Sequence, residues 1–319
     1  MSTKAIQATD LVKTFGADHA VDGVSFDVGR GEVLGLLGPN GAGKTTVVKM
    51  LTTLLRIDGG AATVAGFDVG TDPDSVRRVI GLAGQAAAVD EKLTARENLE
   101  LFARLYKVPR QRRRDKIDAL LERFDIGAFA DRPASTYSGG QRRRLDIAAA
   151  LVADPLALFL DEPTTGLDPR SRAEVWASVR DLAASGTAIL LTTQYLDEAD
   201  QLADQIVVID RGKTVAEGTP ESLKADVGRD VLEVHVGDGP GLDRASEIVA
   251  TIPGATIDLG RRQLEVPITR GAAESLGVLR RLDDNEVAID DFQLRRPTLD
   301  DVFLAITGSP TLPIEEDHS

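Results

Sequence analysis

Cysteine is absent from this chain of 319 residues, and aromatic residues make up only 4% of it. The lack of cysteine excludes disulfides and thiolate zinc sites. The sequence also lacks any run of about eighteen uncharged apolar residues, so a membrane-spanning helix is not expected. The N-terminal stretch MSTKAIQATDLVK has no apolar core of the kind that a signal peptide needs, which predicts a protein that stays in the cytoplasm.

Positive charge is also in deficit, because 37 Lys and Arg face 51 Asp and Glu, for a formal net charge of -14. Such an acidic balance argues against broad affinity for nucleic acid or for an anionic membrane surface, so no nucleic-acid partner is expected. Hydrophobic residues make up 42% of the chain and charged residues 28%, which is typical of a folded soluble protein. The length allows one large domain and a smaller one, or two domains.

Apolar runs of strand length alternate with helical patterns over the first two thirds of the chain. The runs are EVLGLL (32–37), LALFLDEP (156–163), TAILLTTQ (187–194) and IVVID (206–210). Such alternation predicts an α/β domain with a mostly parallel sheet. Residues 4–28 are predicted to form short strands, with a turn at GADHA (16–20).

The pattern changes after about Gly218. Shorter segments follow in the order βαββαβ, which predicts a small α+β domain of the split-βαβ kind. We therefore place a first domain at 1–222 and an accessory domain at 226–308. Residues 309–319, which are acidic, are predicted to be a disordered tail.

The stretch GPNGAGKT (38–45) lies between a predicted strand and a predicted helix. Glycines at this spacing let backbone N–H groups point at a phosphate, and the following helix adds its positive end. Lys44 can then reach the β- and γ-phosphates, and the Thr45 hydroxyl can coordinate Mg²⁺. A Gly-rich turn could match this pattern by chance, but the strand-loop-helix context favours a nucleoside triphosphate site.

A second half of this site is predicted at the end of LALFLDEP, where two carboxylates follow an apolar strand. Asp161 can hold Mg²⁺ while Glu162 orients and polarises the attacking water. The alternative is an acidic cap on the next helix. The phosphate loop beside it favours the catalytic interpretation.

The stretch YSGGQRRRLDIAAAL (137–151) begins with small residues directly before a helical pattern. Ser138, Gly139 and Gly140 therefore form a second candidate anion site at a helix N-terminus. The three arginines that follow, residues 142–144, lie in the first turn, where positive charge opposes the helix dipole. They are either a solvated basic face or the partners of an incoming anion, and we prefer the anion.

Together these motifs resemble the ATP-binding subunits of ABC transporters, over residues 4 to about 222. GPNGAGKTT looks like the Walker A loop, Gln85 like the Q-loop glutamine, YSGGQ like the signature motif, LFLDEP like Walker B and TTGLDP (164–169) like the D-loop. Phe15 falls where that family has an aromatic residue that stacks on adenine. The resemblance implies that ATP contacts Phe15, Gly38, Pro39, Asn40, Gly41, Ala42, Gly43, Lys44, Thr45, Thr46, Ser138, Gly139, Gly140, Gln141 and Asp168. It also implies that Thr45, Gln85 and Asp161 hold Mg²⁺, and that Glu162, Gln194 and Gln85 serve catalysis.

The stretches GQAAAVDEKLTARENL (84–99) and RRPTLDDVFLAITG (295–308) are similar to the daunorubicin/doxorubicin-resistance type of this family. The resemblance implies a head-to-tail dimer with a second copy, in which Ser138 and Gly140 act across the interface on the other chain's ATP. It implies a separate multi-spanning permease, a place on the cytoplasmic face of the cell membrane and the export of hydrophobic drug-like compounds. The predicted helical subdomain, about 86–153, would receive a short helix of that permease.

One position departs from the family pattern. The family usually has histidine at the end of the strand TAILLTTQ, where this chain has Gln194. An amide still donates and accepts a hydrogen bond, but it cannot become cationic, so we predict slow hydrolysis that depends on Glu162. The alternative is that Gln194 only caps the next helix.

Three functions remain open from the sequence. The first is the energising subunit of an exporter; the second is an ABC ATPase that acts on nucleic acid or ribosomes; the third is a nucleotide-dependent switch, which Gln194 keeps open. The second is disfavoured because its members usually carry two ABC units, long coiled-coil insertions or cysteine-zinc modules. In the accessory domain we find no catalytic cluster, and the apolar stripe of LDDVFLAI (299–306) predicts a packing helix.

Overall fold

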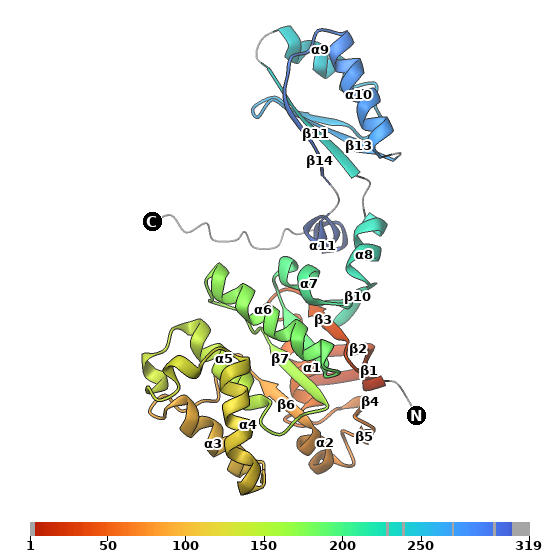
Figure 1. Ribbon diagram of the computed structural model, residues 1–319. Coiled ribbons are helices and arrows are strands. Elements are labelled where there is room, and N and C mark those ends of the chain that lie inside the picture. The colour runs from red at the N-terminus through yellow and green to blue at the C-terminus, as the bar shows by residue number, and fades with distance from the viewer. Residues whose placement is uncertain (1–3, 228–229, 238–239, 270, 296–297, 308–319) are drawn as a thin grey trace. The chain divides into compact units, whose positions relative to one another are not determined.

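The computed structural model describes residues 4–227, 230–237, 240–269, 271–295 and 298–307 (Figure 1). The chain divides into two compact units, residues 1–220 and 221–319. The predicted tail, 309–319, lies outside the described residues. In the described part of the chain, no helix combines the length and the apolar character needed to cross a bilayer.

A six-stranded sheet organises the first unit, in the order β10-β9-β3-β8-β7-β6. Its strands are β3 (Val33–Leu37), β6 (Ile80–Ala83), β7 (Ala157–Asp161), β8 (Ala188–Thr193), β9 (Gln205–Asp210) and β10 (Lys213–Gly218). All neighbours pair in parallel except β9 and β10, which are antiparallel. The predicted, mostly parallel sheet is therefore confirmed. Because β8 lies between β3 and β7, the ends of these three strands form one edge.

A second sheet, with all its pairs antiparallel, has the order β2-β1-β4-β5. It consists of β1 (Lys4–Phe15), β2 (Asp18–Gly29), β4 (Gly59–Val64) and β5 (Phe67–Asp68). The expected turn at GADHA was too long. His19 already pairs with Thr14, and Gly16, with φ 62°, lets the chain reverse within two residues.

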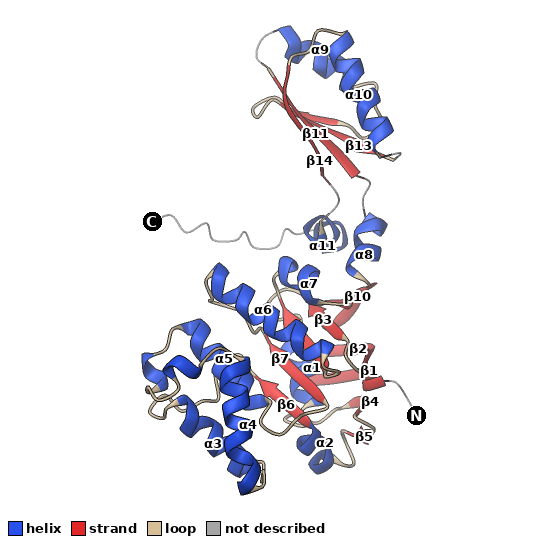
Figure 2. Cartoon of the chain, viewed as in Figure 1, coloured by secondary structure: helices blue, strands red, loops and turns tan. Residues whose placement is uncertain are grey.

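Helices pack around the six-stranded sheet (Figure 2). They are α1 (Lys44–Leu51), α2 (Pro73–Val79), α3 (Ala95–Leu105), α4 (Arg110–Arg123), α5 (Gly139–Ala150), α6 (Pro169–Ala184) and α7 (Leu196–Leu202), with short 3-10 turns η1 (Gly127–Phe129) and η2 (Ala134–Thr136). Of these, α3 and α4 lie beside the β6 edge of the sheet (Figure 2). Alternate residues of β7 enter two different cores. Leu158 and Leu160 pack in one with α3, α4 and α5, while Phe159 packs in the other with α1 and the antiparallel sheet. Both faces of the strand are thus buried, as its unbroken apolar run requires.

The second unit contains a four-stranded sheet in the order β12-β13-β11-β14, with every neighbouring pair antiparallel. Its elements are α8 (Pro220–Val227), which begins at the division, β11 (Asp230–Val236), α9 (Pro240–Val249), β12 (Thr256–Asp258), β13 (Gln263–Ile268), α10 (Ala272–Asp284), β14 (Ile289–Arg295) and α11 (Leu299–Thr307). Alternate β11 residues Leu232, Val234 and Val236 share a core with side chains of α9 and α10. The fold class predicted from the sequence, an α/β unit followed by a small α+β unit, is confirmed.

Candidate active site

The glycine-rich loop joins β3 to α1 and takes a conformation that only glycine accepts easily. Gly41 and Gly43 have φ values of 83° and 111°. A Cβ on Gly43 would lie 2.4 Å from the carbonyl oxygen of Ala20, and one on Gly38 would lie 2.2 Å from that of Ile209. The loop is thus pressed against the neighbouring backbone, and α1 begins directly after it at Lys44. Free N–H groups at this helix N-terminus suit an anion.

Lys44 is buried, with 4% of its surface exposed. Its Nζ donates to the carbonyl oxygens of Gly38, at 2.8 Å, and Pro39, at 3.1 Å, and lies 3.5 Å from Glu162 Oε1. Burial lowers the pKa of Lys44, and the nearby carboxylates of Glu162 and Asp161 act against this change. The ammonium group therefore binds carbonyl oxygens of its own loop, and it can exchange them for phosphate oxygens.

Asp161 is at the centre of a cluster of oxygen atoms. Its Oδ1 accepts hydrogen bonds from Thr45 Oγ1 at 3.1 Å and from Thr192 Oγ1 at 2.6 Å. The amide of Gln85 donates to Thr45 Oγ1 at 3.4 Å, and rotation of this amide would present its oxygen instead. A carboxylate, a hydroxyl and an amide oxygen are ligands that Mg²⁺ prefers in combination with phosphates. The donor set therefore fits a magnesium ion.

Glu162 follows Asp161 at the end of β7 and has a left-handed backbone, with φ 49°. Its N–H donates to the carbonyl oxygen of Thr192 at 3.1 Å and to Thr192 Oγ1 at 3.0 Å, which fixes this unusual conformation. The side chain of Glu162 lines a cavity of about 590 Å³ together with Asn40, Gln85 and Gly139. Residues predicted from four separate motifs thus meet at one cavity.

The chain is similar to ATP-binding proteins of ABC transporters. The family model for the ABC transporter matches residues 21–165, and the model for the C-terminal domain of DrrA1-3-like ATP-binding proteins matches residues 218–307. The chain is 51% identical to the daunorubicin resistance ATP-binding protein DrrA2 of Streptomyces coeruleorubidus, over 98% of this chain and 97% of that protein. It is 38% identical to the Nod factor export ATP-binding protein I of Ralstonia nicotianae, over 96% and 95%. The solved structure of CbiO1 from Clostridium perfringens, part of the ABC transporter complex CbiONQ, covers 70% of this chain and 92% of its own, with a TM-score of 0.65 and 26% identity.

The chain belongs to the daunorubicin-resistance type of ABC ATP-binding proteins.

The signature motif of this ABC protein forms the N-terminus of α5. The Ser138 hydroxyl accepts from Gln141 N at 3.2 Å, and Gln141 Oε1 accepts from Ser138 N at 3.1 Å, which is a complete capping box. A Cβ on Gly140 would lie 2.4 Å from Ser171 Oγ, and this hydroxyl donates to Asp168 Oδ2 at 2.6 Å. The signature helix and the start of α6, where Asp168 is the N-cap, are therefore packed together.

The three arginines after the signature have separate environments, and the prediction of an anion there is wrong for Arg143 and Arg144. Arg143 donates from Nε to the carbonyl oxygen of Pro163 at 2.8 Å and from Nη2 to that of Asp161 at 3.2 Å. Arg144 donates to the carbonyl oxygen of Phe124 at 3.1 Å. Both side chains are buried and bind backbone, whereas Arg142 pairs with Glu91 at 2.7 Å nearer the surface.

Gln194 directly follows β8, between the ends of β3 and β7, and is partly buried. The alternative that it caps the next helix is wrong, because the N-cap of α7 is Tyr195, and the first-turn N–H of Glu198 donates to the side chain of Asp197 rather than to Gln194. Within the described residues, the Gln194 amide has no hydrogen-bond partner. Its position leaves the amide available to a ligand at the strand ends.

Direct contacts link the residues of the Lys44 cluster, which are Lys44, Thr45, Gln85, Asp161 and Glu162. Other predicted residues lie outside this cluster. Phe15 is at the end of β1, 50% exposed, with Lys13 Nζ 5.6 Å from its ring centre. An exposed ring beside a cation suits stacking with a base. Among the described residues, no hydrogen bond joins Ser138 or Asp168 to Lys44, Asp161 or Glu162.

Two residues that bind parts of the site were not predicted from the sequence. Thr192 forms hydrogen bonds with both Asp161 and Glu162. The only sequence signal for this role is its place at the end of a predicted strand. Asp146, buried beside Arg143 at 3.3 Å, accepts a hydrogen bond from Ala88 N in the segment after Gln85, at 2.7 Å. An arginine and an aspartate three residues apart on a helix can pair, but this spacing does not identify their other contacts.

Proposed function

We propose that this chain is the ATP-hydrolysing subunit of an exporter of hydrophobic drug-like compounds, on the cytoplasmic face of the cell membrane. The observation that carries the proposal is the joining of Lys44, Thr45, Gln85, Asp161 and Glu162 in one cluster, in a chain with full-length similarity to a daunorubicin resistance protein. ATP is the substrate. Mg²⁺, bound by Thr45, Asp161 and Gln85, would neutralise charge on the phosphates.

The side chains of the cluster have distinct roles in this proposal. Lys44 exchanges its carbonyl contacts for phosphate oxygens, and the N–H groups of the loop bind the same phosphates. Glu162 orients the attacking water and polarises it, held in place by Thr192. Gln194 donates its amide N–H toward the γ-phosphate. Because this amide stays neutral, it stabilises developing charge less than a cationic histidine would, which makes hydrolysis slow.

The proposed assembly is a head-to-tail homodimer. ATP bound at Gly38, Pro39, Asn40, Gly41, Ala42, Gly43, Lys44, Thr45 and Thr46 would meet Ser138, Gly139, Gly140 and Gln141 of the second copy. Tighter binding of ATP than of ADP and phosphate by the closed dimer would drive the cycle.

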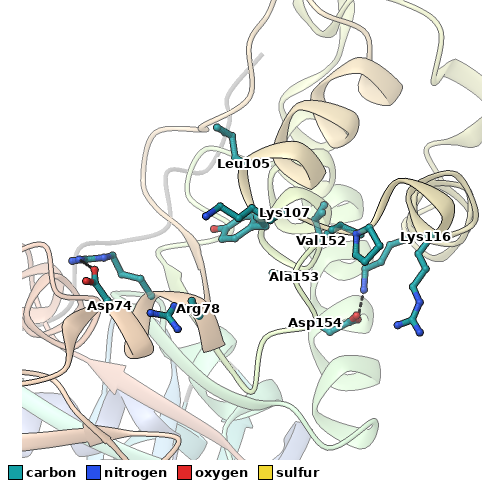
Figure 3. Close-up of a pocket in the computed structure, with 13 residues that line it drawn as sticks. Asp74, Arg78, Leu105, Lys107, Lys116, Val152, Ala153 and Asp154 are labelled. Atoms are coloured by element: carbon teal, nitrogen blue, oxygen red, sulfur yellow. Dashed lines mark hydrogen bonds and ion pairs between the residues drawn. The ribbon is translucent and has the colours of Figure 1, made fainter.

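A basic cavity supports the proposed permease partner. It has a volume of about 840 Å³ and lies between α2 and the helical region (Figure 3). Arg78 comes from α2, and Lys107 from the turn after α3, while Lys116 of α4 pairs with Asp154. The lining also includes Arg77, which pairs with Asp74, together with Arg112 and the apolar side chains of Leu105 and Val108. In an acidic protein, such a basic and partly apolar hollow favours a short acidic segment of a membrane partner.

Affinity purification from detergent-solubilised membranes tests this function. The tagged chain should bring down a multi-spanning membrane protein in near-equal amount, and that partner should stimulate ATP turnover. Arg78→Glu combined with Lys107→Glu should reduce the recovery of this partner, while the exposed control Arg280→Glu in α10 should not. Recovery of ribosomes or nucleic acid instead would leave the ATPase site but overturn the transport function.

The accessory unit is proposed to stabilise the dimer. Removal of residues 226–319 should weaken self-association without abolishing ATP binding, because the Lys44 cluster lies in the first unit. An unchanged dimer after this removal would contradict the role.

A further inference from the structure

Strand β14 is an edge of the sheet in the second unit. It pairs with β11 on one side, and it is the last strand in the order β12-β13-β11-β14. The other side carries a row of backbone N–H and C=O groups that no described strand pairs. An open edge of this kind is a template on which another strand can add.

The apolar layer of this unit continues onto the edge without cover. Directly opposed residues of an antiparallel pair point to the same face, and Leu232 and Val234 of β11 oppose Leu294 and Phe292. The two β11 side chains are 1% and 0% exposed, but Leu294 is 40% and Phe292 54% exposed. On the same face of the sheet, the side chains of β11 are therefore buried and those of the neighbouring strand β14 are exposed. Two large apolar side chains thus face water beside an unpaired edge.

The sequence of this edge is complementary to itself. β14 contains Asp-Phe-Gln-Leu-Arg, residues 291–295. If a second β14 runs antiparallel with Gln293 opposite its own copy, Phe292 of each chain opposes Leu294 of the other. On the other face, Asp291 of each chain opposes Arg295 of the other. A shift of the two-fold axis by one residue along the strand, to Phe292 or Leu294, loses both charge pairs, so the sequence selects one register.

The charged groups have capacity for these contacts. Arg295 donates from Nε to Glu233 Oε1 and from Nη1 to Asp301 Oδ2, each at 2.7 Å. Its Nη2 has no hydrogen bond to a described residue, so two N–H groups are available. Asp291 is exposed and, among the described residues, accepts only from the N–H of Phe292, at 2.8 Å.

We propose that β14 is a self-association surface, on which a second copy of this chain adds its own β14 antiparallel with Gln293 opposite Gln293. The two sheets then form one sheet of twice the width, with a two-fold axis at Gln293 and the same patch used by both copies. This inference deepens the proposed homodimer and rests on it. It assigns the accessory unit a specific contact that needs no nucleotide.

Single-cysteine cross-linking of the full chain tests the register, because the native chain has no cysteine. Directly opposed Cα atoms in antiparallel strands are about 4.5 or 5.5 Å apart, which suits a disulfide in either case. Gln293→Cys should therefore form a covalent dimer under mild oxidation without nucleotide. Thr256→Cys, exposed on β12 at the opposite edge of the same sheet, is the matched control. We expect cross-linking at least tenfold faster at 293 than at 256, and equal rates would overturn the proposal.

Three further variants keep the proposal testable if Gln293→Cys fails to fold. Asp291→Cys and Arg295→Cys chains should cross-link when mixed, and each should cross-link far less alone. Asp291→Arg should weaken the nucleotide-free dimer about tenfold in sedimentation, because it places like charges opposite each other twice per dimer. A mixture that cross-links no faster than either chain alone would overturn the register.

The ATP-dependent dimer of a Glu162→Gln chain is measured separately. If it forms while Gln293→Cys fails to cross-link, β14 pairing is wrong and the head-to-tail ATPase is unaffected. If Gln293→Cys cross-links but no ATP-dependent dimer forms, β14 pairing stands and the ATP sandwich is wrong.

Discussion

The two units of the chain differ in how many charged side chains they bury. In the first unit, Lys44, Arg143, Asp146, Asp161 and Glu198 are each less than 9% exposed. Among the described residues of the second unit, the buried charged side chain is Glu233, which Gln293 and Arg295 reach from the sheet edge. Burying a charge costs free energy unless the group is paired and hydrogen-bonded. The buried charged side chains of the first unit therefore indicate a functional site. In the second unit the partners of the buried charge lie at the sheet edge, where the proposed self-association takes place.

The largest expected effect is on catalysis in the first unit. Glu162→Gln keeps the size of the side chain but removes the carboxylate that polarises water, so turnover should fall about 10²- to 10⁴-fold while ATP binding persists. Phosphate release and nucleotide affinity are measured on the same sample. Glu265→Gln, an exposed carboxylate of β13 in the second unit, is the control and should leave turnover unchanged. Turnover retained by Glu162→Gln would contradict the role of the carboxylate.

The next largest effect is on the stability of the first unit. Arg143→Met removes a buried guanidinium that donates to three backbone carbonyl oxygens and leaves Asp146 without its ion pair, so the free energy of unfolding should fall by about 3–5 kcal/mol. The only tryptophan, Trp176, reports unfolding of the first unit by its fluorescence.

The matched control for that loss lies in the second unit. Arg244 pairs with Glu286 at 2.8 Å, and both side chains are exposed, so Arg244→Met should cost less than about 1 kcal/mol, measured by calorimetry. Equal losses at Arg143 and Arg244 would break the contrast between the units.

Gln194 should have a smaller effect on catalysis than Glu162. Removal of one donor to a developing oxyanion costs about 3 kcal/mol in other enzymes, which bounds the loss in Gln194→Ala. We expect turnover to fall tenfold or more with little change in ATP affinity, and Gln194→His to raise turnover above that of the native chain. Single-turnover hydrolysis measures both. If Gln194→Ala hydrolyses ATP as fast as the native chain, the proposed role is wrong.

The parts of the site that the sequence predicted are those in which one short segment carries the chemistry. The Gly38–Thr45 loop and the Asp161–Glu162 pair each follow a single apolar strand, so the parallel sheet suffices to bring them to one edge. Gln194 could be placed between them for the same reason, since it also ends a strand. To make these three predictions, it was enough to recognise that each segment follows a strand of a parallel sheet.

The parts that the sequence did not predict depend on tertiary position. Arg142, Arg143 and Arg144 are identical letters in a row, yet successive residues on a helix point about 100° apart, so each meets a different environment. The partners of Arg143 come from segments around Gly84 and Pro163, which no local pattern connects to it. Likewise, Phe292 and Leu294 alternate as core residues would, and only the strand order shows that β14 is an edge.

The smallest predicted effect concerns Glu198, a buried carboxylate of α7 that the proposed chemistry does not use. Its Oε1 accepts from Thr164 Oγ1 at 2.7 Å and from Trp176 Nε1 at 3.0 Å, and Oε2 has no partner among the described residues. Burial raises the pKa of Glu198, and the nearby hydroxyls of Thr193 and Thr164 and the Trp176 N–H act against this increase. The carboxylate form is thus penalised in the folded chain.

The sign of the pH dependence follows from this raised pKa. A folded-state pKa above the unfolded value gives a contribution to stability that is complete below the unfolded pKa and is lost as the pH rises through the folded pKa. Glu198→Gln keeps the acceptor for Thr164 and Trp176 but cannot ionise. The melting temperature of this variant minus that of the native chain should therefore rise as the pH increases from the unfolded-state pKa through the raised folded-state pKa, and should level off above it. Glu247→Gln, on the exposed surface of α9, should show a flat difference. A flat difference for Glu198→Gln would mean that ionisation of Glu198 does not limit the stability of the first unit.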